Sequence, residues 1–279
     1  MPRPDFLIIG AQKAGTSWLA HNLAQHPHLY LPAEELHYFD KSARFARGPA
    51  WYEAQFAPPP GVTCVGEKTP DYLWSDERGG EDHTPGIAER VHGTYPDLRL
   101  ICVLRDPVTR AVSAARHLLQ TGRVRPSTPL DALLIGDQRA LAEPHGVLAH
   151  GFYARQLRRY LALFGAGRLC ILFYEDDLRD EPLGTLQRVC RFLGVDGDFG
   201  FPDRSRRINE LGLSRRGLAL AYGLPWLGRP IRALDRRWAT PYRPEAAPPT
   251  LATLARLYAP ANAELFALLG RSASNWRMS

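Results

Sequence analysis

A short apolar segment that runs into a glycine-rich loop and then a helix is the feature that most limits the folds open to this chain. Residues 6–9 (FLII) have the pattern of a buried strand, and residues 10–17 (GAQKAGTS) carry two glycines and a lysine. A helix follows, in which Trp18, Leu19 and Leu23 are spaced to share one buried face. A helix start presents unpaired N–H groups and favours negative charge. The segment therefore predicts a central parallel strand that ends in a phosphate-binding loop.

The order of residues within this loop separates two kinds of phosphate chemistry. In the nucleotide-triphosphatase loop G-x-x-x-x-G-K-[ST], the lysine follows the second glycine and stands beside a hydroxyl that binds magnesium. Here Lys13 precedes the second glycine, Gly15, which is followed by two hydroxyl residues. No apolar strand that ends in an isolated aspartate completes a magnesium site. The loop therefore disfavours a P-loop kinase or nucleotidase, which remains the alternative from the same fold.

A second strand end repeats this arrangement. Residues 100–104 (LICVL) form another apolar strand pattern, which leads into Arg105 and then Pro107, a residue suited to the first turn of a helix. Ser113 falls two turns into that helix. Ligands of open parallel sheets bind at the carboxyl ends of the strands, so both loops can face one crevice.

Both segments resemble sulfotransferases that use 3′-phosphoadenosine-5′-phosphosulfate (PAPS) as the sulfuryl donor. Residues 12–19 (QKAGTSWL) resemble the 5′-phosphosulfate loop, and residues 105–113 resemble the segment in which an arginine, and a serine eight residues later, hold the 3′-phosphate. The resemblance implies PAPS as donor, 3′-phosphoadenosine-5′-phosphate (PAP) as product and no metal. It also implies donor contacts from Lys13, Ala14, Gly15, Thr16, Ser17, Trp18, Arg105 and Ser113.

Residues 34–39 (EELHYF) resemble the K-E-x-H-F-F element of heparan-sulfate-type and related bacterial sulfotransferases, whose glutamate deprotonates the acceptor. The match assigns the base to Glu35, while Glu34 stands where the family commonly has lysine. In an extended segment, Glu35, His37 and Phe39 would share one face. His37 is the rival base, because histidine has a suitable pKa and serves this function in other branches.

Two further residues match family positions near the acceptor. Residues 66–72 (GEKTPDY) resemble the element G-E-K-[ST]-P-x-Y, so Lys68 is expected to stabilise charge that develops as the S–O bond breaks. His117 follows Ser113 by one helical turn, where family members often carry a histidine. Both are therefore candidate catalytic residues beside Glu35, His37 and Lys13.

Length and pattern indicate an α/β fold. The 279 residues are 45% hydrophobic, and residues 169–178 (LCILFYEDDL) supply a third strand followed by a helix, in which Tyr174 is assigned a structural role. We expect one three-layer domain over residues 1–279, with a central parallel sheet and the P-loop NTPase-like sulfotransferase fold. Residues 5–200 form its core. Residues 201–279 match only loosely; they are expected to hold terminal helices and a loop that closes over the donor through Arg215 and Arg216.

Charge and cysteine content restrict the partners and the location. The net charge of +6 comes without a basic run that would indicate nucleic-acid binding. The four cysteines lack metal-ligand spacing, which suits reduced thiols in a cytoplasmic protein. We expect no signal peptide, no membrane span and therefore no integral membrane association. The Ala/Arg/Pro-rich composition suits a bacterial gene, and the oligomeric state stays unknown.

The sequence thus predicts a PAPS-dependent sulfotransferase that acts by direct in-line transfer. The acceptor is a hydroxyl or amine of a glycan, a glycolipid or a secondary metabolite, because nothing in the sequence narrows it further. Besides the kinase-like phosphotransferase, the alternative is a non-catalytic protein that binds 3′-phosphonucleotides, which the glutamate at position 34 leaves open.

Overall fold

Strand β1 (Phe6–Gly10) lies at the centre of a parallel sheet of five strands, as its apolar sequence predicts. The computed structural model describes residues 2–74, 86–206, 208, 212–238 and 240–276. The strand order is β2-β3-β1-β4-β5, and each pairing is parallel. The other strands are β2 (Leu29–Tyr30), β3 (Cys64–Lys68), β4 (Arg99–Leu104) and β5 (Leu169–Phe173). The strands predicted near residues 6, 100 and 169 are therefore confirmed.

The chain forms two compact units, and each is described by itself. The first comprises Met1–Asp106, Phe152–Ile208 and Ala261–Trp276 and contains the whole sheet. Its helices are α1 (Thr16–Leu23), α2 (Ser42–Phe45), α3 (Pro49–Glu53), η1 (Pro70–Leu73), α4 (Ile87–Thr94), α7 (Tyr153–Phe164), η5 (Ala166–Arg168), η6 (Tyr174–Arg179) and α8 (Pro182–Leu193).

The second unit comprises Pro107–Gly151, Asn209–Pro260 and Arg277–Ser279 and is helical in its described residues. Its helices are α5 (Pro107–Thr121), α6 (Leu130–Leu134), η2 (Arg139–Leu141), η3 (Glu143–His145), η4 (Ala149–Gly151), α9 (Arg215–Gly223), η7 (Pro225–Leu227) and α10 (Gly228–Trp238). The last helix, α11 (Pro248–Leu269), begins in this unit and continues into the first.

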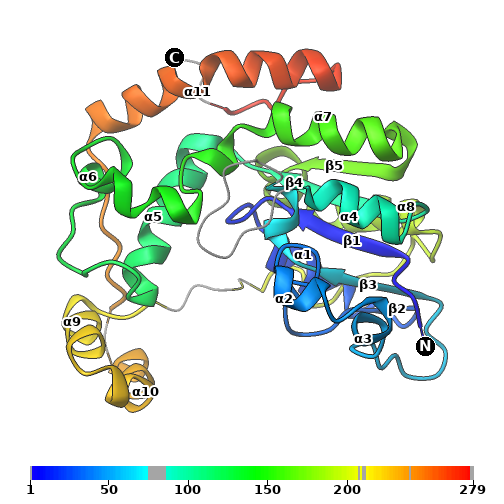
Figure 1. Cartoon of the computed structure of the whole chain (residues 1–279), viewed down its shortest axis with the longest axis horizontal. Helices are drawn as coiled ribbons and strands as arrows, with labels where there is room; N and C mark the ends of the chain where they lie inside the picture. The colour runs from blue at the N-terminus through cyan, green and yellow to red at the C-terminus, as the bar shows by residue number, and fades with distance from the viewer. Residues whose placement is uncertain (1, 75–85, 207, 209–211, 239, 277–279) are drawn as a thin grey trace. The chain divides into compact units, whose positions relative to one another are not determined.

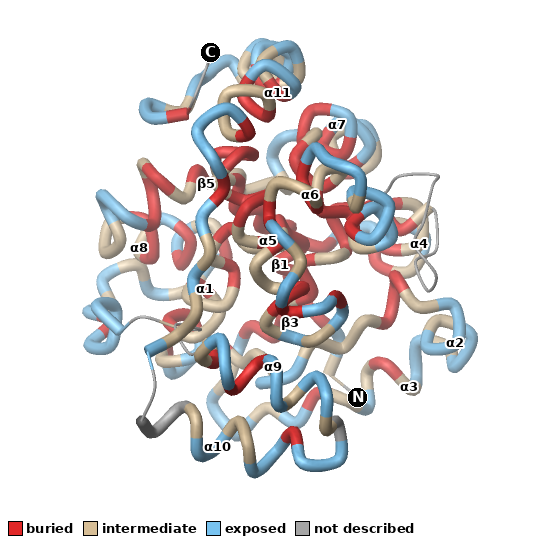
Figure 2. The backbone as a smooth tube through the Cα atoms, turned by 90° about the vertical axis from the view of Figure 1, so that its left-hand side faces the viewer, coloured by how far each residue is buried: buried red, intermediate tan, exposed pale blue. Residues whose placement is uncertain are grey.

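Helices cover both faces of the sheet in the first unit. Helices α1 and α8 pack together on one side, and α4 and α7 pack together on the other (Figures 1 and 2). All five residues of β1 are buried, which requires a layer on each face. This is the three-layer α/β architecture with a central parallel sheet that the sequence predicts.

The pairing of β1 with β3 requires a glycine at position 66. Phe6 stands opposite Gly66 of β3, and a Cβ atom on Gly66 would lie 2.5 Å from the Phe6 ring. The same register sets Ile8 opposite Lys68, so β3 ends next to the end of β1. The carboxyl ends of β1, β3 and β4 therefore meet at one edge of the sheet, where parallel α/β proteins bind their ligands.

The helices begin and end near their sequence signals. Helix α5 starts at Pro107, and α8 is followed by Gly194, whose φ of +80° is the left-handed conformation typical of a glycine after a helix. Helix α1 buries Leu19 and Leu23 completely, as predicted, but Trp18 only in part.

Candidate active site

The loop between β1 and α1 leads into a helix start without a cap. Gly15 has φ +97° and Lys13 has φ +66°, so the backbone enters the left-handed region twice. Among the described residues, no side chain caps α1, and its first turn contains no acidic residue. The first N–H groups of the helix are therefore suited to an anion.

Arg105 lies against the backbone of this loop. Its Nη1 donates to the carbonyl oxygen of Lys13 at 3.1 Å, and its guanidinium carbon lies 4.8 Å from the centre of the Tyr174 ring. A Cβ on Gly15 would lie 2.9 Å from the same ring. Tyr174 thus contacts both the loop and Arg105, a position that its assigned structural role did not anticipate. The Nε of Arg105 is buried and has no hydrogen-bond partner in the described residues.

The other loop residues predicted to contact the donor differ in accessibility. Ala14 and Thr16 are buried, and Trp18 is partly buried, with its indole N–H donating to the carbonyl oxygen of Arg204 at 3.0 Å. This bond joins α1 to the segment that follows α8. Their contacts with a donor stay predictions.

Lys68 connects the predicted base to the loop. Its Nζ donates to Oε1 of Glu35 at 2.5 Å and to Oγ of Ser17 at 3.4 Å. Lys13 belongs to the same environment, because burial lowers its pKa and the charge of Glu35 opposes this shift. Residues from three separate sequence motifs therefore meet at the edge of the sheet.

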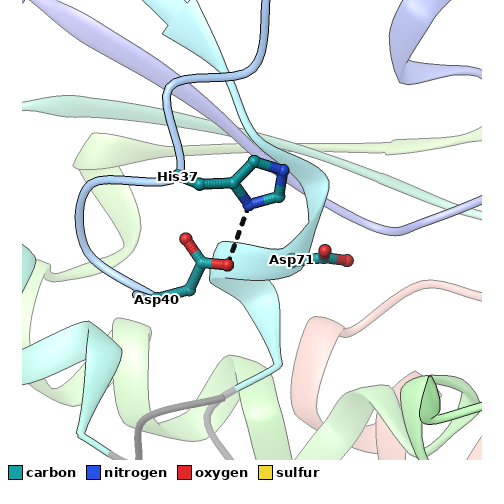
Figure 3. Close-up of side chains that lie close together, drawn as sticks. All are labelled: His37, Asp40 and Asp71. Atoms are coloured by element: carbon teal, nitrogen blue, oxygen red, sulfur yellow. Dashed lines mark hydrogen bonds and ion pairs between the residues drawn. The ribbon is translucent and has the colours of Figure 1, made fainter. Parts of the chain in front are cut away.

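His37 lies between Glu35 and Asp40, and Figure 3 shows it beside Asp40 and Asp71. The Nε2 atom of His37 lies 3.4 Å from Oε2 of Glu35, and its Nδ1 lies 2.9 Å from Oδ2 of Asp40. Asp71 lies beside them and accepts a hydrogen bond from Gln12 at 3.2 Å. Neither aspartate was expected from the sequence to belong to the site. Their only signal is that each follows a family motif residue by three positions.

These side chains are also close enough to one another to surround a cation. One ligand atom each from His37, Asp40 and Asp71 lies within 4.8 Å of the others. A cation at this place would have to replace the hydrogen bond between His37 and Asp40. The metal-free reaction expected from the sequence stays a prediction.

The contacts of Glu35 and His37 set their ionic states. Burial alone would raise the pKa of Glu35, but the hydrogen bond from His37 and the charge of Lys68 outweigh it and lower the pKa to about 2. Burial would lower the pKa of His37, but hydrogen bonds to Asp40 and Glu35 raise it to about 10. At neutral pH, Glu35 is a carboxylate and His37 an imidazolium. An imidazolium has no lone pair that can accept a proton, so this state favours Glu35 as the base.

The segment that carries both residues is not extended, and the predicted alternation is wrong. His37 has φ +48°, which turns the chain, and Phe39 is fully buried while Glu35 and His37 are partly exposed. In the described residues this segment pairs with no strand. The N–H of His37 donates instead to Oγ1 of Thr69 at 3.4 Å. Side chains rather than a neighbouring strand therefore fix the backbone.

Glu67 is the centre of that side-chain support and was missed as a functional residue. It is fully buried, and its carboxylate accepts from the hydroxyls of Tyr52 and Tyr72 at 2.7 Å each and of Thr69 at 3.0 Å. It also accepts from the N–H of Leu36 at 3.3 Å. Burial raises the pKa of Glu67, and these four donors oppose the shift. The only sequence signal for a role of Glu67 was its position between the glycine and the lysine of the motif, Gly66 and Lys68.

Four predicted residues belong to the second unit. Ser113 and His117 are partly buried on α5, and Arg215 and Arg216 are exposed at the start of α9. The guanidinium of Arg215 lies 5.9 Å from the centre of the Tyr242 ring. The donor and acceptor roles of these four residues stay predictions.

The fold and the site together define a class of protein. A parallel α/β sheet whose central strand ends in a lysine-bearing anion loop is typical of P-loop-like nucleotide-binding proteins. Residues 3–209 match the protein family described as "Sulfotransferase domain", and the chain belongs to this family. The family, fold class and enzyme class predicted from the sequence are thereby confirmed.

Curated relatives come from one group of enzymes. Mouse heparan sulfate glucosamine 3-O-sulfotransferase 6 is 33% identical over 201 residues, which cover 69% of this chain and 52% of the relative. Mouse heparan sulfate glucosamine 3-O-sulfotransferase 5 is 26% identical over 279 residues, or 98% of this chain and 74% of the relative. The chain therefore spans about half the length of the first of these relatives.

Solved structures agree on the fold. A sulfotransferase from Alicyclobacillus acidocaldarius has a TM-score of 0.73 and 27% identity, and the match covers 99% of this chain and 100% of that one. The sulfotransferase domain from the curacin biosynthetic pathway has a TM-score of 0.50 and 16% identity, covering 92% of this chain and 98% of that one. The second likeness concerns the fold alone.

Within the described residues of the chain, no helix is both long and apolar enough to cross a membrane. All four cysteines are free thiols, three of them buried and Cys170 partly buried.

Proposed function

We propose that this chain transfers the sulfuryl group of PAPS to a hydroxyl or amine of an acceptor, with glycans as the first acceptor class. Membership of the sulfotransferase domain family supports the reaction. The glycan class is supported by the names of the curated relatives, which are heparan sulfate glucosamine 3-O-sulfotransferases. Glycolipids and secondary metabolites are acceptors of the same chemistry.

The donor fits the groups at the end of β1. The uncapped start of α1, the ammonium of Lys13 and the hydroxyl of Ser17 suit the 5′-phosphosulfate. Arg105, whose buried Nε lacks a partner among the described residues, and Ser113 are assigned to the 3′-phosphate. PAPS supplies an activated sulfuryl group whose leaving group is PAP.

The contact of Lys68 with both Glu35 and Ser17 is the observation that carries the proposal. It brings a carboxylate and an ammonium to the phosphosulfate loop, with 2.5 Å between Nζ and Oε1 and 3.4 Å between Nζ and Oγ. Glu35 takes the proton of the acceptor hydroxyl or amine as the new S–O or S–N bond forms. Lys68 and Lys13 neutralise the charge that the departing 5′-phosphate oxygen gains as its bond to sulfur breaks.

His37 has a supporting role in this scheme. Held by Asp40 and protonated at neutral pH, it donates toward Glu35 and keeps the carboxylate oriented. His117 is assigned to the acceptor side, and Arg215 and Arg216 to closing the donor site. No metal is required, because lysines and backbone amides supply the positive charge that magnesium provides in phosphoryl transfer.

Calorimetric titration with PAP, AMP and ATP, with and without magnesium, tests the donor. We expect tight, magnesium-independent binding of PAP and weak binding of the other two. Transfer is then measured with radiolabelled PAPS and a panel of desulfated glycans. A preference for ATP with magnesium would return the chain to the kinase-like class. PAP binding without transfer to any acceptor, glycan or small molecule, would indicate the non-catalytic alternative.

A further inference from the structure

The second unit carries an unusual concentration of exposed apolar side chains. Helices α9 and α10 and the turn η7 between them, residues 215–238, form what we call the hairpin surface. Eight large apolar side chains are exposed in the described chain, and five of them lie here. They are Leu220 (54% exposed), Tyr222 (42%), Trp226 (75%), Leu227 (44%) and Leu234 (67%). Several large exposed apolar side chains within one short segment indicate an interaction site.

Helix α10 directs apolar residues outward. Leu227, Pro230 and Leu234 follow one another at intervals of three and four residues and are all exposed. Arg232, on the opposite side of the helix, is partly buried, as is Ile231, which is spaced by four residues from Leu227 and three from Leu234. A surface helix normally buries its apolar stripe and exposes its charges. The outward stripe therefore needs a covering that the described residues do not supply.

The charge of the same segment is strongly positive. Residues 212–238 contain six arginines and a single acidic residue, Asp235. Asp235 accepts hydrogen bonds from the N–H and the hydroxyl of Ser214 at 2.6 and 2.5 Å. Its carboxylate therefore already has hydrogen-bond partners within the unit. The arginines are Arg215, Arg216, Arg229, Arg232, Arg236 and Arg237.

A cavity opens beside this surface. Its volume is about 560 Å³, and it lies among the end of α5, α9 and α10. Leu119, Leu218 and Tyr222 contribute apolar walls, and Arg229 and Arg232 contribute guanidinium groups. A cavity that combines apolar walls with two arginines suits an amphiphile with an anionic head.

We propose that the hairpin surface docks on an anionic lipid bilayer. Trp226, Leu227 and Leu234 enter the boundary between headgroups and acyl chains, and the exposed Arg229 pairs with lipid phosphate. Exposed tryptophan and leucine beside arginine are the composition of helices that lie in this boundary. Docking of a second copy through the same face would bring two basic segments together, and this repulsion favours the bilayer. The proposal does not depend on sulfuryl transfer.

Sedimentation of the full chain with lipid vesicles tests the proposal. We expect binding to phosphatidylcholine vesicles that contain phosphatidylglycerol and little binding to phosphatidylcholine alone. Added salt should weaken it, since exposed charges are screened. Replacing Trp226 and Leu234 together with alanine should lower the partition coefficient by about tenfold or more. Arg229→Gln should weaken binding to anionic vesicles by a few-fold.

The matched control replaces Ile135 and Leu141 with alanine, because these side chains are also exposed and belong to the same unit. This variant should bind vesicles like the original chain, and circular dichroism checks that each variant is folded. Absence of vesicle binding by the unaltered chain would overturn the proposal without reference to any variant. So would concentration-dependent dimerisation, seen by light scattering, that the Trp226 and Leu234 double variant abolishes, because a second copy would then cover the surface.

Discussion

Lys68 donates to Glu35 at 2.5 Å, from the end of the strand next to the one that leads into the anion loop. The pair joins the proposed general base to a cation that also contacts Ser17 of the loop. The carboxylate and the ammonium neutralise one another before a donor binds, so this pair carries no net charge. A developing negative charge on the donor would compete with Glu35 for Lys68 and so release the base as the S–O bond breaks.

Glu35→Gln should separate binding from chemistry. The amide cannot accept the acceptor proton, so we expect transfer to fall by about 10²- to 10⁴-fold, while PAP binding changes little. The measurement is the rate of radiolabelled sulfuryl transfer, together with calorimetry of PAP. Glu34→Gln is the matched control, since Glu34 is exposed and adjacent. Transfer unchanged in Glu35→Gln would remove this residue as the base.

His37 should give a characteristic dependence of stability on pH. Its pKa rises from 6.5 to about 10 in the folded chain, so its contribution is complete below pH 6.5 and is lost as the pH rises through about 10. Glu35 acts in the opposite direction: its pKa falls from 4.5 to about 2, so its contribution is complete above pH 4.5 and is lost toward pH 2. The difference in unfolding free energy between the original chain and His37→Asn should therefore be largest between pH 4.5 and 6.5 and shrink toward pH 10.

Denaturant titrations at several pH values measure this difference, and NMR of the His37 ring measures its protonation directly. Asp40→Asn, which removes the charge that faces Nδ1 at 2.9 Å, should lower the pKa of His37. A His37 ring that titrates near 6.5 in the original chain would contradict the assigned imidazolium.

Arg105→Ala should weaken the binding of PAP more than the binding of AMP. Arg105 also holds the carbonyl of Lys13, so both ligands should lose some affinity when the loop loosens. The excess loss for PAP reports the contact with its 3′-phosphate, and we expect it to be about tenfold or more. Arg168→Ala is the control, because Arg168 forms an exposed ion pair with Asp97 at 2.9 Å. Equal losses for PAP and AMP would mean that Arg105 only supports the loop.

Local patterns explain why much of the fold could be predicted from the sequence. Strands β1, β4 and β5 are apolar runs, and α5 and α8 carry a proline at the start and a glycine after the end, so neighbouring residues specify each of them. The anion loop is equally local, because a glycine and a lysine close to a helix start are enough to identify it.

Distant side chains explain what the sequence did not reveal. The turn at His37 depends on a hydrogen bond from its N–H to Thr69, more than thirty positions later, and the alternation rule assumes a neighbouring strand that is absent in the described residues. Asp40 and Asp71 reach His37 only through this turn. No pattern within a short window contains that information.

Gly66 should tolerate no side chain while Phe6 is opposite it. A Cβ would lie 2.5 Å from the Phe6 ring, so Gly66→Ala should destabilise the chain by about 1–3 kcal/mol. The smaller side chain in Phe6→Leu should relieve the clash, making the double variant more stable than the sum of the single changes predicts. Denaturant unfolding of the four proteins measures the coupling. Additive changes in the unfolding free energy would show that other parts of the structure shift to accommodate the added Cβ.

Glu67 should control both stability and activity through the backbone of residues 36–38. Glu67→Ala leaves the buried hydroxyls of Tyr52, Tyr72 and Thr69 without their acceptor, which should cost about 3 kcal/mol or more. Tyr52→Phe removes a single donor and should cost only about 1 kcal/mol. Because Leu36 also loses its partner, Glu67→Ala should disturb the segment that carries Glu35 and His37.

Transfer measured well below the melting temperature distinguishes this effect from global unfolding. If Glu67 positions that segment, the folded Glu67→Ala protein should lose transfer while still binding PAP, because the loop after β1 does not contact Glu67 through any hydrogen bond in the described residues. Tyr52→Phe should keep most of its transfer. Folded Glu67→Ala protein with full activity would show that the carboxylate supports the core alone.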